Sequence, residues 1–137
     1  MYLELLNKES RGIDGVAEVL SYLSDKYLMG VVTSSRRIHF DAIHRSSGLL
    51  KYFNFVLTGE DYTKFKPDPE PYLLSIERSG FMKEQCIAVE DSERGLASAT
   101  AAGIKCIIIP STLTSSCKFV GAYKVLDNIR ALPDILV

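Results

Sequence analysis

The 137-residue chain is long enough to bury the core of a single domain, and its 47% hydrophobic and 24% charged residues are ordinary for a globular protein. A formal net charge of −1 without a basic cluster argues against nucleic acid as a partner. No apolar stretch approaches the roughly 20 residues of a membrane span. Glu4, Lys8 and Glu9 interrupt the start too early for a secretory signal. We therefore predict a cytoplasmic protein with neither nucleic acid nor a membrane as its partner.

The three cysteines, Cys86, Cys106 and Cys117, lack the spacing of a metal site. Cys86 and Cys106 fall at the starts of predicted strands, where a cysteine packs as a small hydrophobic side chain. We interpret them as structural residues of a protein in a reducing compartment, where disulfides are rare.

The first half of the chain alternates between helix and strand patterns. Apolar residues at helical spacing predict a helix over residues 16–26. The almost wholly apolar run over residues 28–33 is typical of a strand that is covered on both faces. A second helix over residues 36–46 and a second strand over residues 53–58 follow.

The third predicted helix has clear signals at both ends. Asp68 can cap it, Pro69 suits its first position, and Gly80 ends it. The strand that follows, over residues 86–89, leads directly into the acidic pair Glu90-Asp91.

The last part of the chain continues the alternation. A helix begins at Ser92 and ends at Gly103, and the β-branched run over residues 104–109 predicts a buried strand. A short strand over residues 123–126 and a helix from about residue 127 close the domain. Strands separated by helices pair in parallel through right-handed crossovers. We therefore predict an α/β fold with a doubly wound parallel sheet, a Rossmann-like three-layer αβα arrangement.

Polar residues follow the predicted strands, and the carboxyl ends of the strands are where such sheets bind ligands. Thr33, Ser34 and Ser35 leave the first strand before a helix, where hydroxyls and backbone N–H groups suit a phosphate oxygen. Helix capping explains Thr33 as well, and taken alone it is the better explanation. Lys66 lies in a proline-rich turn after the next strand and could neutralise a phosphate or a carboxylate nucleophile. Taken alone, Lys66 is better explained as a solvated surface lysine.

The acidic pair Glu90-Asp91 is harder to explain as surface charge. Successive side chains on a strand point in opposite directions, so both acids reach one ion only if the strand ends there. Two carboxylates crowded at a sheet edge repel each other unless a cation separates them. We therefore favour a metal site with Glu90 and Asp91 as ligands over a plain acidic surface.

The ordered set Thr33, Lys66 and Glu90-Asp91 resembles the haloacid dehalogenase-like hydrolase superfamily, in the branch that contains beta-phosphoglucomutase and phosphoglycolate phosphatase. The segment VVTSS is similar to the family's second motif, KPDPEPY to its third, and VEDSERGLASATAAGIK to its fourth. The resemblance covers roughly residues 12–137.

This resemblance implies a role for each motif residue. The Ser or Thr of the second motif holds the phosphoryl group, which assigns Thr33, beside Ser34, to phosphate binding. The lysine of the third motif steadies the nucleophile and the phosphate, which makes Lys66 a catalytic residue. The acidic pair of the fourth motif binds Mg²⁺, which assigns Glu90 and Asp91. The implied activity is a Mg²⁺-dependent phosphohydrolase or phosphomutase acting on a small phosphomonoester or sugar phosphate.

The family's first motif is an apolar strand that ends in Asp-x-Asp, and no segment of this sequence matches it. Its first Asp is the nucleophile and its second is the general acid and base. Residues 1–11 resemble the tail of a cap-domain helix, and residues 12–137 resemble a partial core. The resemblance thus implies a fragment that lacks the nucleophile, the central strand and the cap domain, and is inactive alone. We predict that the strands ending at Thr33 and Glu90 pair directly, or that the chain forms a strand-swapped assembly or homodimer.

A second function of a different class stays open. The chain could be a non-catalytic module, either a pseudoenzyme that binds phosphate or Mg²⁺ or a receiver-like regulatory domain. In receivers the lysine follows the phosphoacceptor Asp, whereas Lys66 precedes Asp91 here, which argues against a receiver. Binding of Mg²⁺ without turnover would distinguish a module from an enzyme.

Overall fold

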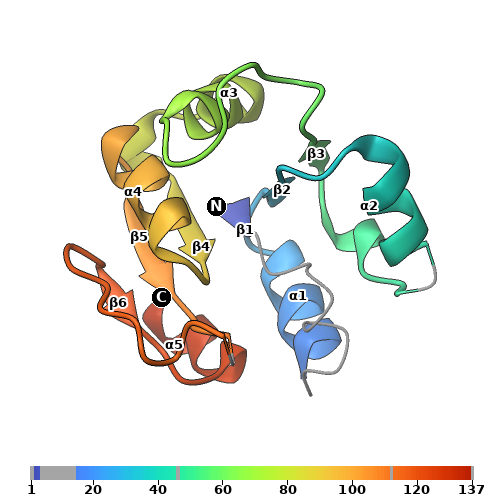
Figure 1. The fold of residues 1–137 in the computed structure, drawn as a ribbon. Helices are drawn as coiled ribbons and strands as arrows, with labels where there is room; N and C mark the ends of the chain where they lie inside the picture. The colour runs from blue at the N-terminus through green and yellow to red at the C-terminus, as the bar shows by residue number, and fades with distance from the viewer. Residues whose placement is uncertain (1, 4–14, 46, 112, 137) are drawn as a thin grey trace.

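A parallel sheet organises the computed structural model, which describes residues 2–3, 15–45, 47–111 and 113–136. Within these residues its six strands are β1 (Tyr2–Leu3), β2 (Gly30–Val32), β3 (Phe55–Leu57), β4 (Ile87–Glu90), β5 (Lys105–Ile108) and β6 (Lys124–Val125). They lie in the order β3-β2-β1-β4-β5-β6 (Figure 1). The direction of winding reverses between β1 and β4, which is the position where open α/β sheets bind ligands.

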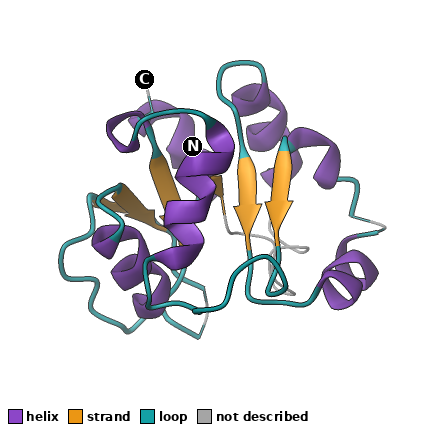
Figure 2. Cartoon of the chain, turned by 90° about the horizontal axis from the view of Figure 1, so that it is seen from above, coloured by secondary structure: helices purple, strands orange, loops and turns teal. Residues whose placement is uncertain are grey.

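Helices cover both faces of the sheet (Figure 2). The described α-helices are α1 (Val16–Ser24), α2 (Arg37–His44), α3 (Glu70–Ser79), α4 (Glu93–Ala101) and α5 (Leu132–Ile135). Short 3₁₀ helices occur at η2 (Leu50–Tyr52), η3 (Lys83–Gln85) and η4 (Ile129–Ala131). Helices α1 and α5 lie on one side of the sheet, and α3 and α4 lie on the other (Figure 1).

Two hydrophobic cores result from the alternation of side chains along each strand. Val31 and Val89 enter the core beneath α1 and α5, whereas their neighbours Val32 and Ala88 enter the core beneath α3 and α4. A strand that is buried on both faces must be apolar at every position, which explains the continuous apolar runs in the sequence. The predicted three-layer αβα arrangement with a parallel sheet is confirmed.

The centre of the sheet differs from the prediction. Strand β1 lies between β2 and β4, where Tyr2 pairs with Gly30 and with Ala88, and Leu3 pairs with Val89 (Figure 1). The predictions that the central strand is missing and that the strands ending at Thr33 and Glu90 pair directly are therefore wrong. The physical reason is that the facing edges of β2 and β4 carry backbone groups that need partners, and a strand between them serves both.

The N-terminal segment also differs from the predicted cap-domain tail. Residues 2–3 are extended and belong to the sheet, so a helix is wrong for these two residues. The rest of the segment 1–11 lies outside the described residues, and the boundary between it and a core over residues 12–137 stays a prediction. Because the chain's own β1 fills the central position, the sheet needs no strand from a second chain there.

The predicted helix signals are confirmed at Gly80 and Ser92, whereas α3 begins one residue later than predicted, with Pro69 and not Asp68 as its N-cap. The side chain of Asp68 accepts a hydrogen bond from the N–H of Glu70 at 2.9 Å, Pro69 precedes α3, and Gly80 ends the helix with a φ of 78°. The Ser92 hydroxyl accepts a hydrogen bond from the N–H of Gly95 at 3.1 Å and caps α4. These caps fix where α3 and α4 begin, immediately beside the predicted motifs.

Two further expectations concern the whole molecule. Across the part of the chain that the structure describes, no helix has the length and apolar character that a membrane span requires. Cys86 and Cys106 are buried thiols, as predicted for structural cysteines, and Cys117 is a half-buried thiol. Burial, together with the nearby Glu90 carboxylate, raises the pKa of the Cys106 thiol far above its ordinary value.

Candidate functional site

The first part of the candidate site is the turn that follows β2. Thr33 is buried, and its N–H donates to the carbonyl of Leu57 at 3.0 Å, which extends the pairing of β2 with β3 by one residue. Its hydroxyl accepts a hydrogen bond from the N–H of Ser35 at 3.2 Å. The N-cap of α2 is Arg36, so Thr33 stabilises the turn and is not the helix cap that was the alternative. Ser34 is exposed in the same turn.

The loop after β3 holds this turn from the side. The hydroxyl of Tyr62 donates to the carbonyl of Thr33 at 2.7 Å, and the N–H of Gly59 donates to the carbonyl of Ser35 at 2.9 Å. A Cβ at Gly59 would lie 2.6 Å from the Ser34 carbonyl oxygen, so only glycine allows this approach. Burial, with smaller contributions from the charges of nearby acids, raises the pKa of Tyr62 to about 12.

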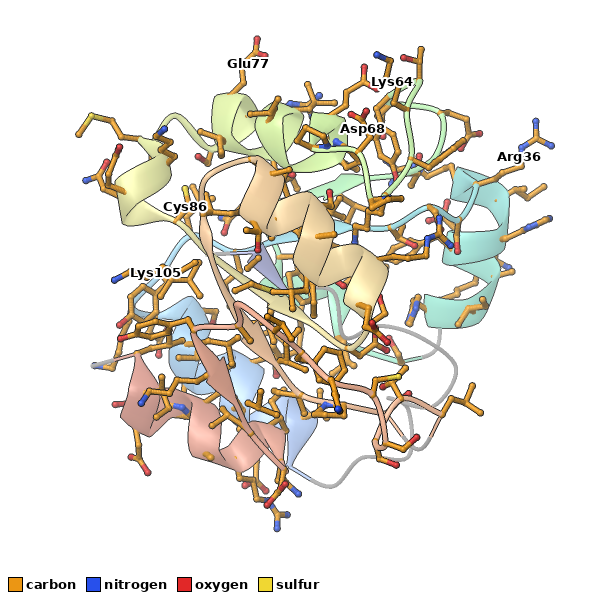
Figure 3. All side chains as sticks on the ribbon, turned by 60° about the vertical axis from the view of Figure 1, so that its left-hand side comes forward. Arg36, Lys64, Asp68, Glu77, Cys86 and Lys105 are labelled. Carbon is orange, nitrogen blue, oxygen red and sulfur yellow. The ribbon has the colours of Figure 1, made fainter. Side chains whose placement is uncertain are left out.

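Lys66 is the central residue of the site. Its side chain is only 8% exposed although the neighbouring Phe65 and Pro67 are exposed, so the alternative of a solvated surface lysine is wrong. The ammonium Nζ lies 2.6 Å from Oε2 of Glu90 and donates to the carbonyl of Val32 at 3.4 Å. By contrast, Lys64 and Arg36 project away from the ribbon (Figure 3). Lys66 therefore joins the carboxyl end of β2 to that of β4.

Glu90 is the buried partner of Lys66, with 1% of its surface exposed. Its Oε2 also accepts a hydrogen bond from the hydroxyl of Tyr72 on α3, and Nζ of Lys66 lies 5.1 Å from the centre of the Tyr72 ring. A Cβ at Gly95 would lie 1.8 Å from Oε1, so the first turn of α4 packs directly against the carboxylate. Burial, followed by the charge and hydrogen bond of Glu90, raises the pKa of Tyr72 well above its ordinary value.

Asp91 follows Glu90 at the end of β4 and is partly exposed. Its carbonyl accepts a hydrogen bond from the Thr114 hydroxyl at 2.6 Å, which fixes the residue against the loop after β5. Among the described residues, no three His, Cys, Asp or Glu side chains gather into a metal-binding group. Asp91 and Glu90 thus lie at the predicted edge, but in different surroundings: one carboxylate reaches the surface and the other is buried beside an ammonium.

Helix α4 fixes the loop that carries Lys66. The guanidinium of Arg94 donates to the carbonyl of Lys66 at 2.6 Å, and the hydroxyl of Ser98 donates to the carbonyl of Asp68 at 2.7 Å. The peptide bond between Lys66 and Pro67 is cis. The same helix that begins after Asp91 therefore determines where the lysine loop lies.

Several residues of the site could not be recognised from the sequence. Tyr62 and Tyr72 contribute through hydroxyls whose partners lie 29 and 18 residues away in the chain. Gly95 could have been suspected, because a glycine inside a helix is unfavourable unless another group approaches closely. Thr33, Lys66 and the acidic pair, which were predicted to share one edge, are brought together there.

The geometry suits an anion with an oxygen-rich head group. A buried ammonium lies at the carboxyl edge of a parallel sheet, and beside it a turn presents hydroxyls. Because Glu90 compensates the charge of the ammonium, an anion at this edge would depend on hydrogen-bond donors of the turn as well as on Lys66. Phosphate, with several acceptor oxygens, matches this combination of donors.

A family model described as haloacid dehalogenase-like hydrolase matches residues 1–109 of the chain. Among curated proteins, YhcW of Bacillus subtilis, provisionally described as a phosphatase, is 34% identical over 106 residues, which are 77% of this chain and 48% of YhcW. The protein CbbY of Rhodobacter capsulatus is 31% identical over 126 residues, 88% of this chain and 56% of CbbY. The chain thus spans about half the length of these relatives.

Solved structures show the same similarity. A Thermotoga maritima protein provisionally described as a beta-phosphoglucomutase is 28% identical, with a TM-score of 0.81 over 90% of this chain and 58% of its own. CbbY of Rhodobacter sphaeroides, solved with phosphate, is 27% identical, with a TM-score of 0.79 over 88% of this chain and 55% of its own. A Bacillus subtilis hydrolase solved with magnesium is 24% identical, with a TM-score of 0.78 over 90% and 54% of the two chains, which shows a common fold.

Proposed function

Because this chain belongs to the haloacid dehalogenase-like hydrolase family, we propose that it forms the phosphate-binding part of a Mg²⁺-dependent phosphohydrolase or phosphomutase. The substrate class is a small phosphomonoester or sugar phosphate. The observation that carries the proposal is the position of Lys66, which is buried, paired with Glu90 and bonded to the end of β2 at the carboxyl edge of the sheet. The phosphate bound by the related CbbY structure supports the same ligand class.

Each residue of the edge has a definite role in this proposal. Lys66, paired with Glu90, supplies an ammonium group to the phosphoryl group, and Thr33 and Ser34 supply hydroxyl groups from the turn after β2. Asp91 suits a Mg²⁺ ligand, because the ion is usually held by one or two carboxylates together with water and substrate phosphate. When bound, Mg²⁺ would neutralise negative charge on the phosphoryl group.

The chemical step needs a carboxylate nucleophile in this family, and the sequence contains no Asp-x-Asp segment. Strand β1 occupies the central position, but the residues after it in the sequence are Glu4-Leu5-Leu6. We therefore infer that the 137-residue chain binds phosphate but does not turn over phosphomonoesters by itself. This absence also favours the second candidate, a non-catalytic module that binds phosphate and Mg²⁺ through the same residues.

Phosphate binding is tested by calorimetric titration of the chain with inorganic phosphate in the presence of Mg²⁺. Lys66→Met should weaken binding about 10- to 100-fold, since a hydrogen bond to a charged group contributes about 1.5–3 kcal/mol. Lys64→Met is the matched control, because Lys64 is exposed and two residues away, and it should leave the affinity unchanged. Equal affinities of the two variants would contradict the proposal.

Turnover is tested separately with p-nitrophenyl phosphate. We expect no hydrolysis above the rate without protein. Hydrolysis that is lost in both Lys66→Met and Asp91→Asn would show that the chain supplies its own nucleophile and is a complete catalyst.

A further inference from the structure

The acidic pair does not provide two equivalent metal ligands. Oε2 of Glu90 already takes the ammonium of Lys66 at 2.6 Å and the hydroxyl of Tyr72. Oε1 lies against the backbone of α4, so close that a Cβ at Gly95 would overlap it. Glu90 therefore has donors or protein atoms on both of its oxygens.

The charges around Glu90 lead to the same conclusion. A divalent cation on this carboxylate would lie beside the Lys66 ammonium in a region of low dielectric constant, where like charges repel strongly. Mg²⁺ also keeps several waters in its octahedral shell, whereas Glu90 is 1% exposed. Removing one member of such a buried pair is costly, since it leaves the other charge uncompensated.

Tyr72 orients the Glu90 carboxylate toward Lys66. The tyrosine is completely buried in α3, and its ring lies beside the Lys66 ammonium while its hydroxyl bonds to Glu90. One side chain thus contacts both members of the ion pair. Because the backbone of α3 fixes the ring, the hydroxyl holds the carboxylate in the orientation that meets Lys66.

We propose that Glu90 is the fixed counter-ion of Lys66, that Tyr72 is its positioning residue, and that a divalent cation at this edge binds through Asp91 without Glu90. The part that concerns the cation rests on the proposed function. The arrangement replaces the two-carboxylate metal site that the sequence suggested. It makes the metal and the lysine separate elements of the site, each with its own carboxylate.

Metal binding is measured by titrating the chain with Mn²⁺ as a paramagnetic probe. Asp91→Asn should weaken Mn²⁺ binding at least 10-fold, whereas Glu90→Gln should change it less than about 3-fold. An equal loss in the two variants overturns the inference. If Glu90→Gln does not fold, Tyr72→Phe is titrated with Mn²⁺ in its place. This substitution removes only one oxygen atom but takes away a hydrogen bond that holds Glu90. The inference then requires that the Mn²⁺ affinity of Tyr72→Phe equals that of the wild type.

The positioning role is measured by phosphate affinity. Tyr72→Phe should weaken phosphate binding about 3- to 10-fold at unchanged Mn²⁺ affinity. The matched control is Tyr27→Phe, which removes a hydroxyl bonded to the carbonyl of Leu136 on the opposite face of the sheet. Tyr27→Phe should leave phosphate binding unchanged. Equal phosphate affinities of the two variants would overturn the role of Tyr72.

A double-mutant cycle separates this inference from the proposed function. The midpoint of urea unfolding is measured for the wild type, for Lys66→Met, for Glu90→Gln and for the double variant. The midpoint shift of the double variant should be much smaller than the sum of the single shifts, because removing both charges leaves neither unpaired. If the wild type binds neither Mn²⁺ nor phosphate, the proposed function fails. Independently of that result, midpoint shifts that add in the double variant would overturn the pairing of Lys66 with Glu90.

Discussion

The two faces of the sheet both pack apolar side chains, and one of them also buries the ion pair of Lys66 and Glu90. The face covered by α1 and α5 is packed mainly with large aliphatic residues such as Leu20, Leu23 and Leu132. The face covered by α3 and α4 buries Lys66 and Glu90, together with three hydrogen-bonding side chains: Tyr72, Ser75 and Ser98. Both faces contribute stability through burial of apolar area, and the second also holds charges in fixed positions. Changes on the two faces should therefore have separable effects on folding and on binding.

The largest effect on stability is expected on the aliphatic face. Leu20 is completely buried, so Leu20→Ala should lower the free energy of unfolding by about 2–5 kcal/mol. Phosphate affinity under folding conditions should not change. The measurements are urea unfolding and calorimetric titration, with Ile38→Ala, at an exposed position, as the control. A loss of phosphate affinity in Leu20→Ala would show that the two faces are coupled.

Gly95→Ala, on the face that buries Lys66 and Glu90, should lower phosphate affinity as well as stability. The added Cβ would lie 1.8 Å from Oε1 of Glu90, and the carboxylate would have to move away from Lys66. We expect a loss of about 1–3 kcal/mol in stability, typical of overpacking, together with weaker phosphate binding. Ala97→Ser, at an exposed position of the same helix, is the control. Unchanged phosphate affinity in Gly95→Ala would mean that the position of Glu90 does not matter for the site.

A smaller effect is expected at the cap of α4. Ser92→Ala removes the hydroxyl that accepts from the N–H of Gly95 and should cost about 1 kcal/mol. Because α4 holds the lysine loop through Arg94 and Ser98, phosphate binding should weaken in parallel. Thermal unfolding and phosphate titration measure the two effects. A drop in stability with full phosphate affinity would show that the loop does not depend on this end of the helix.

The smallest effect at neutral pH is expected for Tyr62→Phe. The raised pKa of Tyr62 means that the folded state holds this proton more tightly than the unfolded state does. The stability that the protonated Tyr62 hydroxyl contributes is complete below pH 10 and is lost as the pH rises from about 10 to about 12. Urea unfolding across that range should show a steeper fall of stability in the wild type than in Tyr62→Phe. Parallel curves would contradict the shift.

Local signals predicted most of the fold. Gly80 and Ser92 were correctly assigned as helix ends, and Asp68 lies one residue before the N-cap of α3, because capping depends on residues within a few positions of one another. The strands β2 and β4 were found because nearly every position along them is buried and therefore apolar. The two-residue strand β1 was missed because it is too short to show any periodicity.

The position of the candidate residues at one edge of the sheet was predicted, but their contacts with one another were not. The edge that collects Thr33, Lys66 and Glu90 follows from the order of strands and helices. The burial of Lys66 does not, because its partners Val32 and Glu90 lie 34 and 24 residues away in the chain. The sequence treats Glu90 and Asp91 as an equivalent pair, and only the packing of Tyr72 and Gly95 distinguishes them.

The short β1 has a mechanical consequence. In the described fold it is the only strand between the half-sheet β3-β2 and the half-sheet β4-β5-β6. Lys66 joins the two halves at one end by contacting both Val32 and Glu90. A phosphate bound at that end would add a second contact between the two halves of the sheet. Amide hydrogen exchange along the facing edges of β2 and β4 should then slow when phosphate is bound.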